Sequence, residues 1–194
     1  MDSIMGTETP GNANHRARPR IATLWLGGCA GCHMSFLDMD ERLMDLAPRI
    51  SLVYGPLVDR KEFPDQVDVV LVEGAVANED NLHHLQEARK KSRLLVAFGD
   101  CAVTGNVTSM RNTQSSAGVV MDRSFVENAS LHPGVPRSGG ILPRLLDRVI
   151  PVHQAVPVDL FLPGCPPSAD LIFYLISELL EGRSPDLSDK LKYG

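Results

Sequence analysis

Five short apolar segments, alternating with helical patterns, constrain the fold of this chain more than any other feature. Each segment is five or six residues long, is rich in Val, Ile and Leu, and is followed within two residues by Gly or Pro. Near-continuous apolar strands of this kind are typical of a parallel sheet that helices cover on both faces. We expect these strands at residues 21–26, 50–54, 67–72, 93–98 and 158–162.

Helical patterns occupy several of the intervals between the strands. Apolar spacing predicts a helix over residues 34–46. Asn78 is expected to cap a helix over residues 80–91, and Ser168 a helix over residues 169–181. With right-handed crossovers, this alternation predicts an α/β fold, namely a flavodoxin-like doubly wound parallel sheet.

The composition divides the chain into three parts. Its 194 residues suit one domain of ordinary size. Residues 1–20 are predicted to form a flexible N-terminal arm, residues 21–182 the flavodoxin-like domain, and residues 183–194 a polar tail. Within the domain, residues 103–140 carry few periodic apolar positions, so we expect a long irregular insertion that serves a function or contacts a partner.

The charge and hydropathy exclude several classes of protein. The net charge is −5, whereas a nucleic-acid-binding protein needs a basic stripe. The apolar runs are far shorter than the roughly 18 residues needed to cross a membrane, and the N-terminus lacks a secretory signal. We therefore expect a cytoplasmic protein without a nucleic-acid or membrane partner, and its cysteines are not expected to form disulfides.

All four cysteines follow predicted strands. Cys29 and Cys32 come after the strand at 21–26, and the remaining two follow the strands at 93–98 and 158–162; they are Cys101 and Cys165. The carboxyl ends of parallel strands share one edge of the sheet, and open α/β sheets bind ligands there. The topology therefore predicts that the four thiols converge.

The local sequence around the cysteines favours metal ligation over packing. Cys29 and Cys32 lie in a loop of Gly and Ala, and Cys165 precedes a proline, as cluster ligands do in ferredoxins. An inert cysteine would be expected inside an apolar run. A Cys₄ [4Fe–4S] cluster is favoured; a structural zinc ion, a thioredoxin-like pair at Cys29 and Cys32, and unrelated thiols remain alternatives.

A flavin is the other ligand that this fold commonly holds at the same edge. No Ser- and Thr-rich phosphate loop follows the first strand, and cysteines occupy the edge. We do not expect FMN in this chain.

Four further residues are candidates for supporting roles. Glu73 ends a strand at the cysteine edge and is expected either to hold a loop through backbone N–H groups or to face a partner. His33 either donates a hydrogen bond near the cluster or simply begins a helix. Arg111 and Asn112, in the insertion, are candidates for contacts with a partner subunit.

Four motifs resemble the small subunit of [NiFe] hydrogenases over roughly residues 20–182. They are the sequences at 26–33 (LGGCAGCH), 72–76 (VEGAV), 99–102 (GDCA) and 162–167 (LPGCPP). The continuations at 33–41 and 105–112 are most similar to the small subunit of cytoplasmic, NAD-reducing (bidirectional) hydrogenases.

The resemblance implies one proximal [4Fe–4S] cluster with Cys29, Cys32, Cys101 and Cys165 as its ligands. It also implies a large partner subunit with the Ni–Fe centre, and diaphorase subunits that hold FMN and NAD. The chain would act only as a subunit of an H₂:NAD⁺ oxidoreductase, because it lacks the paired Cys-x-x-Cys motifs that hold nickel.

The sequence also departs from some relatives. Met34 stands where exported hydrogenases commonly have a glutamate, so no proton-transfer role is carried over to it. The related complex I subunit has adjacent cysteines in place of Cys-x-x-Cys. Two alternatives stay open: the small subunit of another soluble hydrogenase, deazaflavin- or heterodisulfide-linked, and a zinc-stabilised structural domain.

Overall fold

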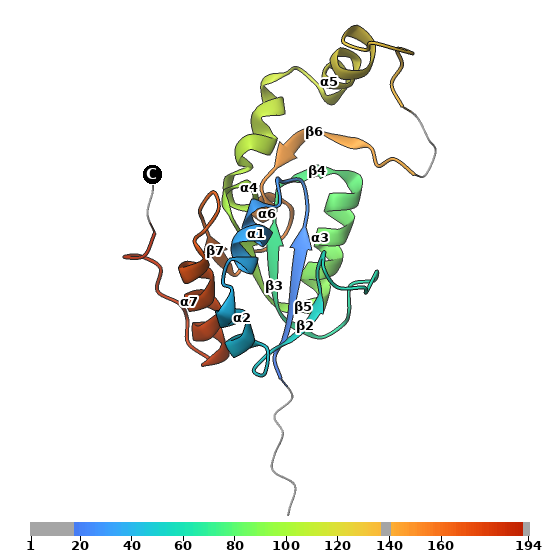
Figure 1. The fold of residues 1–194 in the computed structure, drawn as a ribbon. Coiled ribbons are helices and arrows are strands. Elements are labelled where there is room, and N and C mark those ends of the chain that lie inside the picture. The colour runs from blue at the N-terminus through green and yellow to red at the C-terminus, as the bar shows by residue number, and fades with distance from the viewer. Residues whose placement is uncertain (1–17, 137–140, 192–194) are drawn as a thin grey trace, which may run out of the picture.

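A computed structural model, which describes residues 18–136 and 141–191, contains a central sheet of five parallel strands (Figure 1). The strand order β2-β1-β3-β5-β7 is the flavodoxin-like order 2-1-3-4-5 when the strands are counted within this sheet. The predicted fold class is therefore confirmed. The strands are β1 (Arg20–Trp25), β2 (Ser51–Tyr54), β3 (Val67–Glu73), β5 (Ser92–Phe98) and β7 (Leu160–Leu162).

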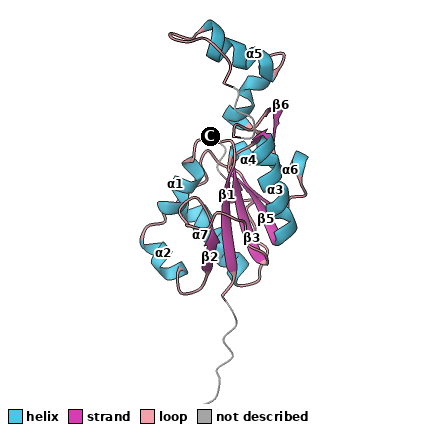
Figure 2. Ribbon diagram, turned by 90° about the vertical axis from the view of Figure 1, so that its right-hand side faces the viewer, coloured by secondary structure: helices cyan, strands magenta, loops and turns pink. Residues whose placement is uncertain are grey.

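Helices cover both faces of this sheet, which explains its continuous apolar strands (Figure 2). In β3, Val69 and Leu71 belong to one core cluster, and Val70 and Val72 to the other. The first cluster packs against α1 (Gly31–Leu37), α2 (Glu41–Leu46) and α7 (Ala169–Leu180). The second packs against α3 (Glu79–Lys91), α4 (Asp100–Thr104) and α6 (Val152–Ala155).

Both predicted helix caps are present. The Asn78 side chain accepts the Asn81 backbone N–H at 2.7 Å, and the Ser168 hydroxyl accepts the Leu171 N–H at 3.3 Å. These bonds satisfy first-turn donors that a helix leaves unpaired.

The single helix predicted over residues 34–46 is wrong. The chain forms α1 and α2 with a break between them, where Asp40 has a φ of 49°. Asp tolerates this left-handed conformation better than most residues. The break buries Met39, which is only 1% exposed, so tertiary packing overrides the local helical pattern.

The last strand is shorter than predicted, because it begins at Leu160 rather than at residue 158. The preceding Asp159 nevertheless continues the contact with β5. Its N–H donates to the Leu95 carbonyl at 3.0 Å, and its carboxylate accepts the Leu95 N–H at 2.7 Å. A side chain thus replaces one partner of the strand ladder.

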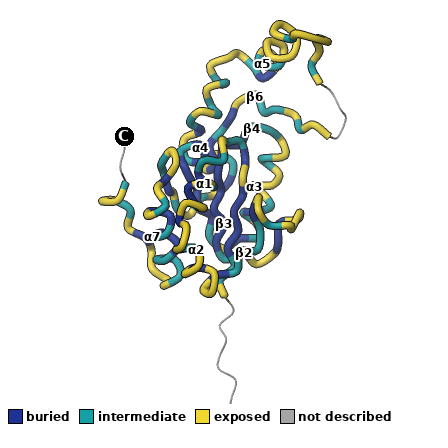
Figure 3. The backbone as a smooth tube through the Cα atoms, viewed as in Figure 1, coloured by how far each residue is buried: buried dark blue, intermediate teal, exposed yellow. Residues whose placement is uncertain are grey.

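The insertion extends away from the sheet and contains more local helix than the sequence predicts (Figures 1 and 3). It includes a 3₁₀ helix, an α-helix and a short π-helix, followed by a strand that pairs with β4 in a separate antiparallel sheet. Exposed residues dominate its outer part (Figure 3). Its elements and β4 are η1 (Asn106–Thr113), α5 (Ala117–Asp122), η2 (Arg123–Glu127), β6 (Leu145–Ile150) and β4 (Val76–Asn78).

The structure describes part of the predicted N-terminal arm and part of the predicted C-terminal tail. Residues 1–17 of the predicted arm lie outside the described residues, and Arg20 already belongs to β1. In the predicted tail, Leu187 and Leu191 pack against the α7 side of the core. In the described part of the chain, every helix is too short or too polar to cross a membrane.

Candidate functional site

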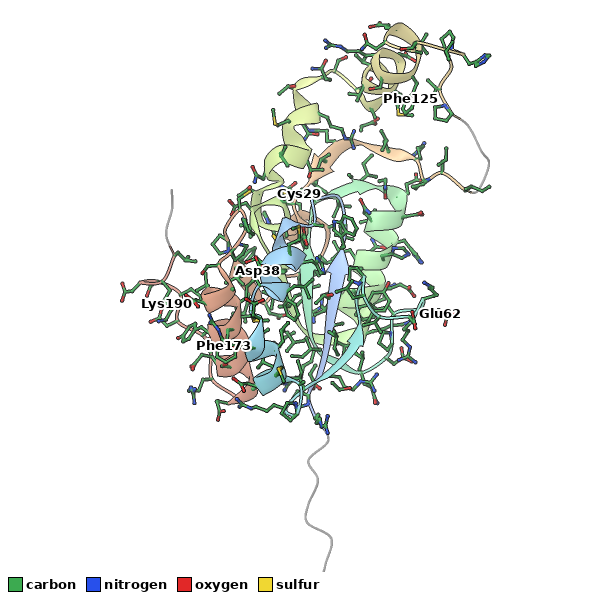
Figure 4. The ribbon with its side chains drawn as sticks, viewed as in Figure 1. Cys29, Asp38, Glu62, Phe125, Phe173 and Lys190 are labelled. Atoms are coloured by element: carbon green, nitrogen blue, oxygen red, sulfur yellow. The ribbon has the colours of Figure 1, made fainter. Side chains whose placement is uncertain are left out.

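The four cysteines lie at the carboxyl edge of the parallel sheet, as their positions in the sequence predict. Cys29 lies in the loop after β1, where Figure 4 labels it, and Cys32 follows in α1. Cys101 is the second residue of α4, which follows β5, and Cys165 lies in the loop after β7. All four are free thiols; Cys32 and Cys101 are buried, whereas Cys29 and Cys165 are exposed.

The thiols lie close enough together for the charge on one to shift the pKa of another. Burial raises the pKa of the Cys32 thiol, and the nearby charges of Glu73 and the other three cysteines raise it further. Burial also raises the pKa of Cys101, with smaller contributions from Cys29 and Cys165, while hydrogen bonds with Thr108 oppose the rise. A thiolate in this site therefore needs a compensating positive charge.

Glycines leave room for the sulfur atoms. A Cβ atom at Gly99 would lie 2.1 Å from the Cys32 sulfur, and one at Gly31 would lie 3.2 Å from the Cys29 sulfur. Gly99 also has a φ of +83°, a conformation that side chains other than glycine rarely adopt. Two loops that carry cysteines are thus shaped by the absence of a side chain.

Asp100 joins the loops that carry Cys101 and Cys165. Its carboxylate accepts the Gly164 N–H at 2.7 Å, and its own N–H donates to the Gly164 carbonyl at 2.9 Å. Sequence reasoning missed this role, although Asp100 precedes the cysteine in the Gly-Asp-Cys motif. The two loops are held in register by one residue of α4.

Glu73 and His33 meet beside Cys32. The Glu73 carboxylate is only 2% exposed and accepts the His33 backbone N–H at 2.9 Å. It also pairs with Nδ1 of the His33 ring. Glu73 therefore holds the cysteine loop through a backbone N–H, which is one of the two roles expected for it.

Arg111 and Asn112 lie on η1, and their side chains bond within the chain. The Arg111 guanidinium donates to the Ala77 carbonyl at 2.8 Å. The Asn112 amide accepts the Val149 N–H at 2.7 Å and donates to the Val149 carbonyl at 2.8 Å. These bonds fasten η1 to β4 and β6, and contact with a partner subunit stays a prediction for both residues.

Sequence reasoning also missed Asn106 and Thr108. The Asn106 side-chain amide lies 3.4 Å from the Cys165 sulfur, and Thr108 lies near enough to Cys101 to lower the pKa of its thiol. The Thr108 hydroxyl also donates to the Gly27 carbonyl at 2.9 Å. Isolated polar residues in a segment without periodicity give little signal. A Gly-Asn pair is typical of a turn, and Gly105 and Asn106 both have a positive φ.

The donor groups at this edge are thiolates, which both zinc and iron–sulfur clusters accept. Within residues 18–136 and 141–191, no three Cys, His, Asp or Glu side chains are grouped tightly enough to hold one metal ion. A zinc ion draws its thiolates to about 2.3 Å, whereas an iron–sulfur cluster spaces them around several iron atoms. The four thiols are therefore not arranged around a single point in this structure.

The fold and the thiol-lined edge define a class of α/β proteins that hold a cofactor where the parallel strands end. Residues 29–179 match the family model described as NADH ubiquinone oxidoreductase, 20 Kd subunit. The chain belongs to this family and, within it, to the small subunits of [NiFe] hydrogenases.

Individual relatives agree with this assignment. The delta subunit of the NAD-reducing hydrogenase of Cupriavidus necator is 38% identical, over 92% of this chain and 87% of that protein. A crystal structure of an NAD⁺-reducing [NiFe]-hydrogenase has a TM-score of 0.87 at 40% identity, over 92% of this chain and 100% of the matched chain. A subunit of the F420-non-reducing vhu hydrogenase of Methanococcus voltae is 38% identical over 89% of this chain, which spans only 60% of that protein.

Proposed function

We propose that this chain is the electron-transfer small subunit of an NAD-reducing [NiFe] hydrogenase, and that its four cysteines hold one [4Fe–4S] cluster. The observation that carries the proposal is the meeting of four coupled thiols, from three loops, at one glycine-lined sheet edge. The relatives indicate NAD as the electron acceptor, since both the Cupriavidus protein and the matched structure are named for NAD reduction.

The charges at the site support the binding of a metal cation. Four thiolates and the buried Glu73 carboxylate would repel one another in the absence of a cation. A coordinating metal deprotonates thiols and supplies the missing positive charge. The proposed ligands are Cys29, Cys32, Cys101 and Cys165.

The cluster supplies reversible transfer of one electron at a time. The chain itself holds two ligand thiols inside the fold, on Cys32 and Cys101, and leaves Cys29 and Cys165 exposed. The exposed pair marks the side where a partner can approach closely. The proposed partners are a large subunit with the Ni–Fe centre, which splits H₂, and diaphorase subunits with FMN and NAD, so this chain is not catalytic alone.

The place of action belongs to the same proposal. An enzyme that reduces NAD works where the NAD pool is kept, so we place the complex in the cytoplasm. The charge of −5 and the absence of a basic stripe in the sequence agree with protein partners rather than nucleic acid.

A second candidate is the small subunit of a hydrogenase that serves another acceptor. The specific observation in its favour is the 38% identity to the vhu hydrogenase chain. The two candidates differ in their partners, so identification of the chains that co-purify with this one separates them. Diaphorase chains support the first candidate, and heterodisulfide- or deazaflavin-linked reductase chains the second.

Metal analysis tests the cluster directly. Anaerobically purified protein should contain about four irons and four sulfides per chain and give an EPR signal on reduction. Stoichiometric zinc without iron would contradict the proposal. Cys101→Ser should lose the cluster and abolish H₂-dependent NAD reduction in the assembled complex. Thr104→Ser, an exposed change on the same helix, should retain both.

A further inference from the structure

The 3₁₀ helix η1 lies against two of the proposed ligand loops, although it contains no cysteine. Its first residue, Asn106, brings its side-chain amide to 3.4 Å from the Cys165 sulfur. Two residues later, Thr108 lies near Cys101, and its hydroxyl and backbone N–H lower the pKa of that thiol. One short segment of the insertion therefore offers hydrogen-bond donors to sulfurs from two different loops.

The position of Asn106 is fixed from both sides. Its N–H donates to the Thr104 hydroxyl at 3.3 Å, and its carbonyl accepts the Ser109 hydroxyl at 2.8 Å. Its φ of 33° is in the left-handed region, which Asn adopts more readily than most residues. These contacts orient the side-chain amide toward the Cys165 sulfur.

Asn106 and Thr108 differ in how many of their donor groups are available to a sulfur atom. The Asn106 amide has two N–H groups, and it donates to Cys165. The Thr108 hydroxyl donates to the Gly27 carbonyl at 2.9 Å, so at most part of its donor capacity acts on Cys101, on which Thr108 also acts through its backbone N–H. Removal of the Asn106 side chain therefore removes more hydrogen bonding to sulfur than removal of the Thr108 hydroxyl.

We propose that Asn106 and Thr108 raise the reduction potential of the cluster by donating hydrogen bonds to the sulfurs of Cys165 and Cys101. The inference rests on the proposed function, because it requires those thiolates to be ligands. When the oxidised cluster accepts one electron, its negative charge increases and spreads over the sulfurs. Donors aimed at sulfur stabilise the reduced state more than the oxidised state. Both are positioning residues, since they act through the ligands.

An EPR-monitored redox titration of the full chain, loaded anaerobically with iron and sulfide, tests this role. Asn106→Gly removes the amide while tolerating the positive φ, and Thr108→Val removes only the hydroxyl. Both variants should titrate at a more negative midpoint potential than the wild type, with the larger shift in Asn106→Gly. Thr113→Val is the matched control, because its hydroxyl bonds the Met110 carbonyl on the same helix, and its potential should be unchanged.

The outcomes separate this inference from the proposed function. A wild-type chain that binds no iron overturns both. Variants that keep their iron and sulfide but titrate at the wild-type potential overturn the inference alone. A purely structural role would lower the iron content or the stability without moving the potential of the remaining cluster. If Asn106→Gly loses its cluster, the midpoint potential of Thr108→Val tests the inference instead, because this variant keeps the Thr108 backbone N–H.

Discussion

The carboxylate of Glu73, at the end of β3, accepts a hydrogen bond from the backbone N–H of His33, at the start of α1, and pairs with the His33 ring. β1 and β3 are neighbours in the sheet, and Trp25 at the end of β1 pairs with Glu73. The order in which strands are added to the sheet changes direction between β1 and β3, and folds of this kind bind their ligands at that point. The contact therefore fixes the Cys29–Cys32 loop to the centre of the sheet.

Replacement of Glu73 by Ala should destabilise the folded chain strongly. It leaves the His33 N–H and Nδ1 without their acceptor in a site where the carboxylate is 2% exposed. Each unpaired buried donor costs about 1–3 kcal/mol, so we expect a loss of about 3 kcal/mol in the free energy of unfolding. Urea unfolding measures it. Glu73→Gln, which retains one acceptor oxygen, should lose less.

Glu62→Ala is the matched control for this change. Glu62 lies in an exposed loop away from the cysteines (Figure 4), so its removal should alter stability by less than about 0.5 kcal/mol. Equal stability of Glu73→Ala and Glu62→Ala would show that the buried contact contributes nothing.

Gly99→Ala should prevent normal assembly of the thiol site. The new Cβ atom would meet the Cys32 sulfur at 2.1 Å, and the backbone φ of +83° would be strained as well. We expect less than half of the wild-type iron content, measured after anaerobic purification. Gly182→Ala separates the two causes: its φ is +72° and nothing lies within 4 Å, so it should cost only the strain, about 1 kcal/mol. Full iron in Gly99→Ala would contradict the steric argument.

The sheet and the convergence of the cysteines could be predicted because both depend on simple physical rules. A strand buried on both faces must be apolar throughout, as Val69 to Val72 are, and parallel strands necessarily end at one edge. A cysteine placed just after such a strand is therefore located in space by its position in the sequence alone.

The rest depends on contacts between distant residues. The break before α2 exists because Met39 fills the core, and a local helical pattern contains no trace of that packing. β4 has three residues and pairs with β6 about seventy positions later, so neither has a recognisable strand pattern. The roles proposed for Asn106 and Thr108 depend on cysteines in other loops, and a local sequence pattern does not reveal them.

Asn112→Ala should loosen the base of the insertion without unfolding the sheet. The Asn112 amide forms two hydrogen bonds with the backbone of Val149, a residue that is 3% exposed. Their loss should cost about 2 kcal/mol locally. Hydrogen exchange should then accelerate by roughly 30-fold for the Val149 amide and its β6 neighbours, while β3 and β5 amides stay protected. Gln114→Ala is the control: Gln114 is exposed, so its replacement should leave the protection unchanged. Unchanged protection in Asn112→Ala would show that these bonds do not hold β6.

Asp159→Asn should lower the stability in a pH-dependent way. Burial alone would raise the pKa of Asp159, but hydrogen bonds from Arg89 and the Leu95 N–H, with the Arg89 charge, hold it below its ordinary value of 3.8. A carboxyl whose pKa is lower in the folded state than in the unfolded chain stabilises the fold above the unfolded pKa, and this contribution is lost as the pH falls through the folded value.

The variant should therefore be less stable than the wild type by about 1 kcal/mol between pH 5 and 7, a modest figure because the Asp159 side chain is 38% exposed. The difference should shrink as the pH falls below 3.8, because the wild type then loses the same charge. Urea unfolding of both proteins at each pH measures it, with Asp65→Asn, whose side chain is 82% exposed, as the control. A difference that stays constant down to pH 3 would show that the ion pair with Arg89 does not stabilise the β5–β7 edge.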